Sequence, residues 1–339
     1  MAKKRSKAIN VDLLEAEYAS LSDVAQRFAD EVVHQLDTLL AKAQVSLSFP
    51  IQRRVKTWAA IAEKLQRTSL QVSTLHELQD LVGFRVILQF RRDVSRVCQL
   101  LRNTFGVLDE YDTADRLRED QFGYSSTHFV VQLPRAWLAL PAMAEMEALR
   151  AEIQVRTTAQ HIWAAASHTL QYKNEASVPP LVRRTIHRVS ALLETVDLEF
   201  ERALTERDLY IQQLSAAAVP QEELNADLIA QILSDVWPEN NEMPGYEMYG
   251  ALISELGSVG IRTRDALEKL FRKHRAQALS EEKRMIADLQ DRQDAWAKTR
   301  LLQERIARGV LLSHVGLTRV VLGLASGEPI VGVPPRQNA

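Results

Sequence analysis

Three segments of the chain alternate polar and apolar residues with a period of two, which is the side-chain period of a β-strand. They are GFRVILQF at 83–90, FGYSSTHFVV at 122–131 and AEIQVRT at 151–157. Their polar positions carry rings, hydroxyls, amides and charges: Arg85, Gln89, Tyr124, Ser126, His128, Glu152, Gln154 and Arg156. The pattern predicts a sheet with one apolar face and one chemically varied face. The varied face is either a solvated surface or a functional one, although tyrosine, histidine and paired opposite charges are unusual choices for solvent.

Helical patterns surround these strands. Apolar residues recur at helical spacing over 11–47, 52–67, 94–105, 157–172 and 181–214. The mixture of strands and helices between 48 and 215 predicts an α+β fold, a mixed sheet flanked by helices. Beyond Pro220 only helical patterns remain. We therefore expect an N-terminal helical segment over 1–47, the α+β domain over 48–215 and an all-helical region over 216–339.

The composition is that of a soluble globular protein, with 46% hydrophobic residues, 25% charged residues and a net charge of −2. Cys98 is the single cysteine, which excludes an internal disulfide framework and a cysteine-based zinc site. The basic N-terminus has no apolar stretch behind it, and the apolar stretch 309–326 is interrupted by His314 and Arg319. We therefore expect a cytoplasmic protein without a membrane anchor.

Basic residues gather on one side of the helix predicted over 52–67. This side carries Arg53, Lys56, Lys64 and Arg67 around the small Ala60. Such a side is either solvated or a cradle for polyphosphate, because lysines two turns apart can reach successive phosphates. No GxxxxGK[ST] motif is present, so a nucleotide would be held without a P-loop.

Two carboxylates flank the varied face. Asp80 precedes the first predicted strand, and Glu152 lies on the polar side of the third. Magnesium prefers one or two carboxylates together with substrate phosphates and waters, and it does not need a cage made only of protein. The two acids therefore predict a Mg²⁺ site at this face of the sheet.

Five separated motifs follow one another along the chain: RVK at 54–56 with Lys64, DLVGFR at 80–85, GYSSTH at 123–128, EIQVRT at 152–157, and Trp163 with HTLQYK at 168–173. In this order and spacing they resemble the synthetase domain of the RelA/SpoT family. The resemblance covers 52–173, with a weaker helical similarity through Leu214. The family is similar in fold to nucleotidyltransferases, which implies a nucleotidyltransferase-like mixed sheet.

The resemblance also implies an activity. Members of this family are ATP-dependent pyrophosphokinases that move the pyrophosphate of ATP to the 3′-hydroxyl of GDP or GTP, giving (p)ppGpp and AMP. It implies that Arg54 and Arg85 sandwich the adenine of ATP, and that Lys56 and Lys64 hold its phosphates. Such a transfer depends chiefly on alignment and charge neutralisation, which cations can supply.

The same resemblance assigns the catalytic and acceptor residues. Asp80 and Glu152 would bind Mg²⁺, and Glu152 would also take the proton from the attacking 3′-oxygen. Tyr124 would stack on the guanine, and His128 would contact phosphate. From their place on the polar face, Gln154 and Arg156 are also expected to help shape the acceptor pocket.

The acceptor itself stays open at this point. Arg116 and Arg118 are the basic residues expected near the acceptor's 5′-phosphates, but Glu119 and Asp120 lie between them and Gly123. An acidic approach is unfavourable for a diphosphate unless Mg²⁺ or the arginines intervene. The resemblance includes toxic members that pyrophosphorylate the 3′ end of tRNA, so GDP, GTP and the tRNA 3′ end are all candidate acceptors.

The role of the region 216–339 has alternatives too. It is expected to be a fused regulator or phage sensor, an oligomerisation module, or a site for a regulatory protein partner. A further hypothesis is a catalytically silent nucleotide sensor, which the presence of both Asp80 and Glu152 disfavours. The long family members that also hydrolyse alarmones carry a His-Asp pair, and no histidine here is followed by aspartate. We therefore expect synthesis without hydrolysis.

Overall fold

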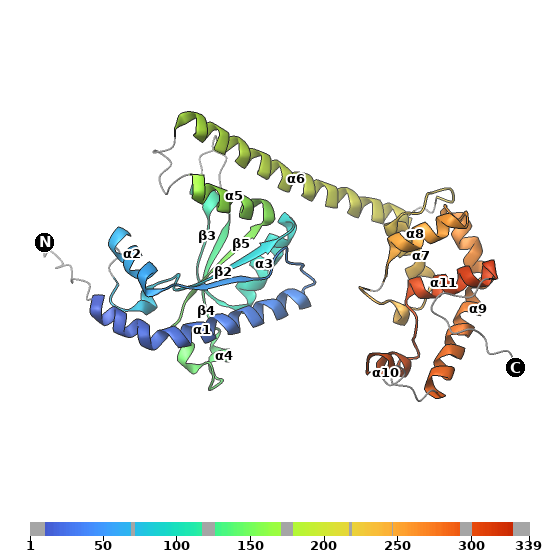
Figure 1. Ribbon diagram of the computed structural model, residues 1–339, viewed down its shortest axis with the longest axis horizontal. Coiled ribbons are helices and arrows are strands. Elements are labelled where there is room, and N and C mark those ends of the chain that lie inside the picture. Colours follow the sequence, from blue (N-terminus) through green and yellow to red (C-terminus); the bar gives the residue numbers. More distant parts are fainter. Residues whose placement is uncertain are drawn as a thin grey trace. The chain divides into compact units, whose positions relative to one another are not determined.

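The computed structural model describes residues 11–68, 72–116, 126–170, 179–216, 219–245, 247–291 and 300–327. The chain forms two compact units, Met1–Leu204 and Thr205–Ala339, which are described separately below (Figure 1). The boundary between them falls inside one long helix. The division at 47 and 215 expected from the sequence pattern remains a prediction.

The first unit is built on a mixed sheet of five strands in the order β1-β2-β5-β4-β3. The strands are β1 (Gln52–Val55), β2 (Val82–Leu88), β3 (Gly106–Asp112), β4 (Thr127–Gln132) and β5 (Ala151–Thr157). β2 and β5 are parallel, and the other neighbouring pairs are antiparallel. The predicted α+β class with a mixed sheet flanked by helices is therefore confirmed.

The two edge strands differ from the prediction. β1 lies within the segment 52–67 that the pattern predicts to be wholly helical, and the helix there, α2 (Trp58–Thr68), begins later. β3 lies in GVLDEYD, which has no clear alternation. An edge strand pairs on one side only and is partly solvated, so it needs no regular apolar positions. The predicted strand at 122–131 is described from Thr127 onward.

The apolar face of the sheet packs into one hydrophobic core with two helices. These are α1 (Val11–Lys42), which runs alongside the sheet in Figure 1, and α3 (Arg91–Thr104). Phe28 of α1, Leu101 of α3 and Ile153 of β5 all belong to this core and are almost fully buried. Cys98 is also buried in it, as expected for a small core residue. Because this face is closed by helices, the polar face is the one left for chemistry.

Two further helices complete the first unit. They are α5 (Thr158–Leu170) and α6 (Pro180–Ala216), and a short α4 (Arg135–Leu138) lies between β4 and β5 in the chain. The Thr157 hydroxyl at the end of β5 donates to Asp197 Oδ2 of α6 at 2.6 Å. Arg92 Nε donates to Glu201 Oε1 at 2.9 Å, and Trp163 of α5 packs on Ile186 of α6. These contacts attach α6 to the sheet.

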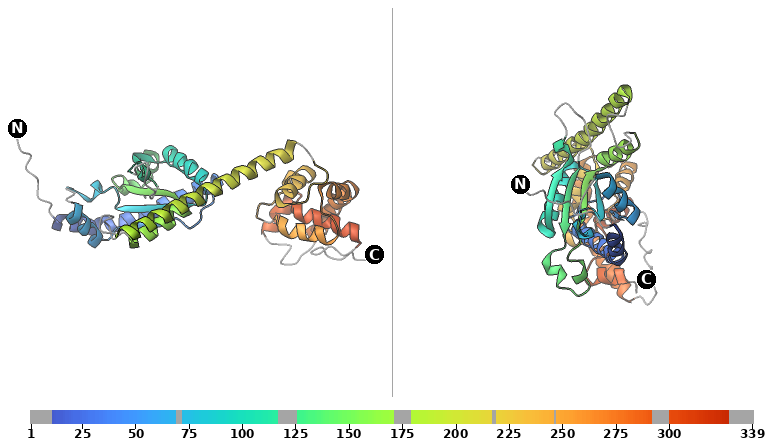
Figure 2. Two further views of the ribbon diagram at one scale, coloured as in Figure 1. Left: turned by 90° about the horizontal axis from the view of Figure 1, so that it is seen from above. Right: turned by 90° about the vertical axis from the view of Figure 1, so that its left-hand side faces the viewer.

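The second unit is helical, as predicted for the region after Pro220. Its helices are α7 (Ala226–Val236), α8 (Tyr249–Ser258), α9 (Arg264–Asp291), α10 (Arg300–Ala307) and α11 (His314–Ser326), and they are seen together in the left-hand view of Figure 2. Leu233, Leu252, Phe271 and Leu317 contribute to its core. In the part of the chain that the structure describes, no helix combines the length and apolar character needed to cross a bilayer.

Candidate active site

The polar positions of the sheet form two adjacent rows on one face. Strand pairing places Gln52, Arg85, Gln154, His128 and Tyr111 in the first row, and Arg54, Gly83 and Glu152 in the second. Within each strand the members of the two rows are two residues apart, so their side chains project from the same side. Of the residues predicted for the varied face, Arg85, His128, Glu152 and Gln154 therefore lie next to one another on one surface.

A cleft of about 270 Å³ opens on this face. Arg54 and Arg85 line it together with Gln154, and both predicted catalytic acids, Asp80 and Glu152, line it as well. The acids reach the cleft from different places, since Asp80 precedes β2 and Glu152 lies on β5. The fold thus brings five of the predicted site residues to one cavity.

Gly83 forms part of the floor of this cleft, between Arg54 on β1 and Glu152 on β5. A Cβ atom added at Gly83 would meet no atom within 4 Å. The position is therefore open toward the cavity, and a side chain there would occupy space that the glycine leaves to whatever enters the cleft.

Asp80 is held between two lysines. Lys64 Nζ of α2 donates to both carboxylate oxygens of Asp80 at 2.8 Å, and Lys56 Nζ forms a close ion pair with Oδ2. Burial alone would raise the pKa of Asp80, but the hydrogen bonds from the two lysines outweigh it and hold the pKa below its usual range. Burial lowers the pKa of the Lys56 ammonium despite the attraction of Asp80. Two cations therefore share one anion, so this corner of the cleft is electropositive.

The route by which the lysines meet differs from the prediction. The spacing of Lys56 and Lys64 predicts one basic helix face, but Lys56 lies between β1 and α2. Its backbone N–H donates to the carbonyl of Leu81 at 2.9 Å. The pairing of β1 with β2 sets this position, and Asp80 then draws both ammonium groups together. The two lysines are therefore brought together by tertiary structure and not by a shared helix face.

Glu152 is held by hydrogen bonds from three side chains. Its Oε1 accepts hydrogen bonds from the Tyr111 hydroxyl and from His128 Nδ1, both at 2.8 Å, and Gln154 Nε2 donates to Oε2 at 3.2 Å. The ring of Tyr111 stacks on that of His128, with centroids 4.8 Å apart and an interplanar angle of 20°. Burial alone would raise the pKa of Glu152, but the hydrogen bonds from His128 and Tyr111 lower the pKa to about 2. Glu152 is therefore fixed in orientation and ionised at neutral pH.

Tyr111 is a site residue that the sequence interpretation missed. It comes from β3, the edge strand without a clear alternating pattern, and it reaches Glu152 only because β3 pairs with β4. The one available signal was the position of an isolated tyrosine within the acidic run DEYD. Pairing that run with the segment around His128 as an antiparallel pair would have placed Tyr111 beside the histidine.

The acceptor residues are only partly described. His128 is buried, and its Nε2 has no hydrogen-bond partner among the described residues. Arg116 ends the short helical turn Thr113–Arg116. Tyr124 and Arg118 lie outside the described residues. The structure therefore brings together the predicted ATP and metal residues, and of the acceptor residues it places the side chains of His128 and Gln154.

The donor set in the cleft suits a magnesium ion that shares its coordination with a substrate. Within the described ranges no group of three or more histidine, cysteine, aspartate or glutamate side chains is arranged to hold a metal. Asp80 and Glu152 both line the cleft, and a pair of carboxylates completed by phosphate oxygens and water is a common magnesium arrangement.

One family model and two known proteins match part of this chain. A family model described as "Region found in RelA / SpoT proteins" matches residues 53–177. The GTP pyrophosphokinase YjbM of Bacillus subtilis is 32% identical over 166 residues, which cover 48% of this chain and 74% of that protein. The GTP pyrophosphokinase YwaC of the same organism is 26% identical over 149 residues, covering 42% and 68%.

The chain also aligns with solved structures over a little more than half of its length. The small alarmone synthetase 1 from Bacillus subtilis aligns with a TM-score of 0.48 and 27% identity, covering 57% of this chain and 98% of that one. The same enzyme bound to its product pppGpp aligns with a TM-score of 0.45 and 29% identity, covering 54% and 93%. The residues matched by the family model end before α6, so the helical second unit lies outside them.

Proposed function

The chain belongs to the RelA/SpoT family of synthetases, and on this basis we propose that it transfers the β,γ-pyrophosphate of ATP to the 3′-hydroxyl of GDP or GTP, releasing AMP. The observation that carries this proposal is that Asp80 and Glu152 line one cleft together with Arg54 and Arg85. A donor and an acceptor nucleotide could meet there over one face of the sheet.

On the ATP side, the two lysines provide the phosphate contacts. Lys56 and Lys64 both donate to Asp80. The phosphates of ATP bring more negative charge than one carboxylate, so they would compete for the ammonium groups. Arg54 and Arg85 line the cleft and would flank the adenine, because a guanidinium plane stacks well on an aromatic ring.

Release of the lysines would leave Asp80 without its counterions, and this is the point at which Mg²⁺ fits the residues present. Asp80 and Glu152 would hold the ion together with substrate oxygens. When bound, Mg²⁺ supplies neutralisation of the charge on the transferred group. The chain would thus exchange one set of cations on Asp80 for another.

Glu152 is assigned to the acceptor's 3′-hydroxyl. A carboxylate with a pKa of about 2 is a weak proton acceptor, because an effective general base has a pKa near the working pH. Its main contribution would be to orient the attacking oxygen through a hydrogen bond. If Tyr111 or His128 turns toward the acceptor, Glu152 loses a donor and becomes a stronger base.

The acceptor would be held next to Glu152. His128 Nε2 is buried and has no hydrogen-bond partner in the described part of the chain, which suits a contact with a phosphate oxygen. Gln154 lines the cleft on the same strand as Glu152. Tyr124, Arg116 and Arg118 complete the proposed acceptor set through the resemblance to the family.

A second candidate function is pyrophosphorylation of the tRNA 3′ end, in which case the helical second unit would act as a fused regulator. The observation that favours it is the acidic pair Glu119 and Asp120, which separates the two arginines from Gly123. The nucleotide-sensor alternative requires that no transfer occurs with any acceptor.

One experiment separates these functions. The full-length protein is incubated with Mg²⁺ and ATP labelled in its terminal phosphates, and GDP, GTP or bulk tRNA is offered in parallel. We expect AMP and a labelled guanosine product with GDP or GTP. Label in tRNA alone would overturn the proposed acceptor, and absence of transfer to all three would support the sensor. The Glu152→Gln variant should abolish transfer, whereas Glu145→Gln, which changes an exposed carboxylate paired with Arg27, should not.

A further inference from the structure

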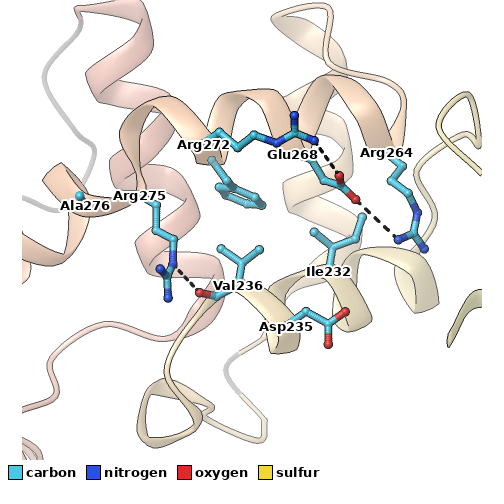
Figure 3. A pocket seen from close by; sticks show the side chains of 9 residues that line it. Ile232, Asp235, Val236, Arg264, Glu268, Arg272, Arg275 and Ala276 are labelled. Atoms are coloured by element: carbon cyan, nitrogen blue, oxygen red, sulfur yellow. Dashed lines mark hydrogen bonds and ion pairs between the residues drawn. The ribbon is translucent and has the colours of Figure 1, made fainter. Parts of the chain in front are cut away.

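The second unit contains a pocket of its own, between α7 and α9. Its volume is about 460 Å³, which lies in the usual range for small-molecule sites. Figure 3 shows the arrangement: α9 runs along one side with a row of charged residues, and α7 lies on the other side. The pocket is formed entirely by residues beyond the part of the chain that the family model matches.

The inner wall of this pocket is apolar and fixed. Ile232 of α7 is 3% exposed and Phe271 of α9 is 2% exposed, and both line the cavity. Trp237 packs on Phe271 in an edge-to-face contact, with ring centroids 5.4 Å apart. A flat or apolar ligand body would pack against the small part of these side chains that is exposed.

The charged wall is formed by three arginines of α9. Arg264 and Arg272 share one carboxylate, since Glu268 Oε1 lies 3.7 Å from Arg264 Nη1 and Oε2 lies 3.3 Å from Arg272 Nη2 (Figure 3). Arg275 Nε donates to the carbonyl of Val236 at 2.7 Å, which holds its guanidinium at the rim. Asp235 is the second acid, so three arginines line the pocket against two carboxylates.

Arg264 is the residue that points to a ligand. It is only 6% exposed, and its contact with Glu268 is longer than a hydrogen bond. Nothing in the described part of the chain accepts a hydrogen bond from its Nε or Nη2 atoms, both of which are buried. A buried guanidinium with unused donors is costly, and an oxyanion that binds two parallel N–H groups removes that cost.

We propose that this pocket binds a small organic anion, with a carboxylate or phosphate group on the arginines and a planar or apolar body on Ile232 and Phe271. The arginines supply charge and paired donors, and the apolar wall favours an organic anion over an inorganic one. The chain therefore carries a ligand site in its helical unit that is separate from the cleft on the sheet.

The test is a calorimetric titration of the full-length protein with phenyl phosphate, inorganic phosphate, benzoate and phenol. We expect phenyl phosphate and benzoate to bind more tightly than either inorganic phosphate or phenol, because each of the latter lacks one half of the complementary chemistry. The double variant Arg272→Gln/Arg275→Gln changes only exposed side chains and should weaken the binding of phenyl phosphate by about tenfold or more. Arg264→Gln should do the same, and circular dichroism should show that it is folded.

Two control variants show whether the ligand binds in the pocket of the second unit or in the cleft of the first. Arg284→Gln changes another arginine of α9 that pairs with Glu281 and Asp288 away from the pocket, so it should leave the binding unchanged. Lys64→Gln changes the cleft of the first unit and should remove only binding that belongs there. The proposal is overturned if the wild-type protein shows no saturable binding. Equal binding of phenol would overturn it too, as would equal losses in the double variant and Arg284→Gln.

Discussion

The two acids of the cleft are held in opposite ways. Asp80 is surrounded by cations, with Lys56 and Lys64 on the same carboxylate. Glu152 is surrounded by a hydroxyl, an imidazole and an amide. The pKa of both acids is lowered against the effect of burial, by hydrogen bonds from Lys56 and Lys64 at Asp80 and by hydrogen bonds from His128 and Tyr111 at Glu152. In the proposed reaction the first arrangement would release its lysines to the phosphates of ATP and take up Mg²⁺, whereas the second would fix the direction of one oxygen.

The largest expected effect tests the hydrogen-bonded acid. Glu152→Gln keeps the shape of the side chain but removes its charge and its capacity to accept a proton, so transfer to GDP or GTP should fall by about 10³-fold. Release of AMP at saturating ATP measures this. Glu145→Gln, on an exposed residue, serves as the control. Residual activity within tenfold of the wild type would show that Glu152 is not at the reacting centre.

The next effect is on stability. The pKa of Glu152 in the folded protein is about 2, below the ordinary value of 4.5, so its ionised form favours folding at pH above 4.5. This contribution, on the order of 3 kcal/mol, should be lost as the pH falls from 4.5 toward 2. Denaturant unfolding of the wild type and of Glu152→Gln at a series of pH values measures it. A difference between the two proteins that stays constant from pH 6 to pH 3 would contradict the hydrogen-bonded arrangement.

A smaller effect is expected at the lysine-bound acid. Asp80→Asn leaves two neighbouring ammonium groups without their counterion, which should lower the free energy of unfolding by about 2 kcal/mol. Added pyrophosphate should restore much of this loss by binding the same lysines. Thermal unfolding with and without pyrophosphate tests both statements, with Asp37→Asn on the exposed side of α1 as the control. Equal responses to pyrophosphate in Asp80→Asn and the control would contradict the proposed exchange of cations at Asp80.

The smallest effect concerns Tyr111. Tyr111→Phe removes one donor from Glu152 and keeps the ring that stacks on His128. The pKa of Glu152 should rise, but its carboxylate should be held less firmly for orienting the attacking oxygen, so kcat should fall by about fivefold while the KM for ATP stays unchanged. Steady-state kinetics across a range of pH checks this, and Tyr210→Phe, which removes a Tyr–Glu hydrogen bond in the second unit, is the control. A rise in the KM for ATP would contradict this assignment, because it would indicate that Tyr111 acts on the ATP side of the cleft and not on the acceptor side.

The sequence predicts the central part of this architecture well. β2 and β5 lie inside the sheet with one face closed by helices, so polar and apolar residues alternate through most of each strand, with Ile87 as the exception in β2, and the sequence places Glu152 and Gln154 on the correct side. The edge strands have no such requirement. The basic residues of 52–67 fit a helical period equally well, and only the pairing of β1 with β2 decides against it.

The site is less predictable than the sheet, because its contacts depend on pairing between distant segments. Asp80 and Lys64 are joined by a salt bridge that neither residue's local sequence indicates. Tyr111 reaches Glu152 through two strand pairings. The buried Arg264 of the second unit lies outside every recognised motif, and its meaning follows only from the unused donors that the fold encloses.

The glycine between Arg54 and Glu152 has one more consequence. Since a methyl group at position 83 would touch no neighbouring atom, enlarging that residue would leave folding intact and subtract volume only from the chamber above the strands. The width of the cleft can thus be altered by a substitution at this one position, independently of the hydrophobic core that stabilises the fold. A substitution at residue 83 could therefore change which ligands fit the cleft without changing the hydrophobic core.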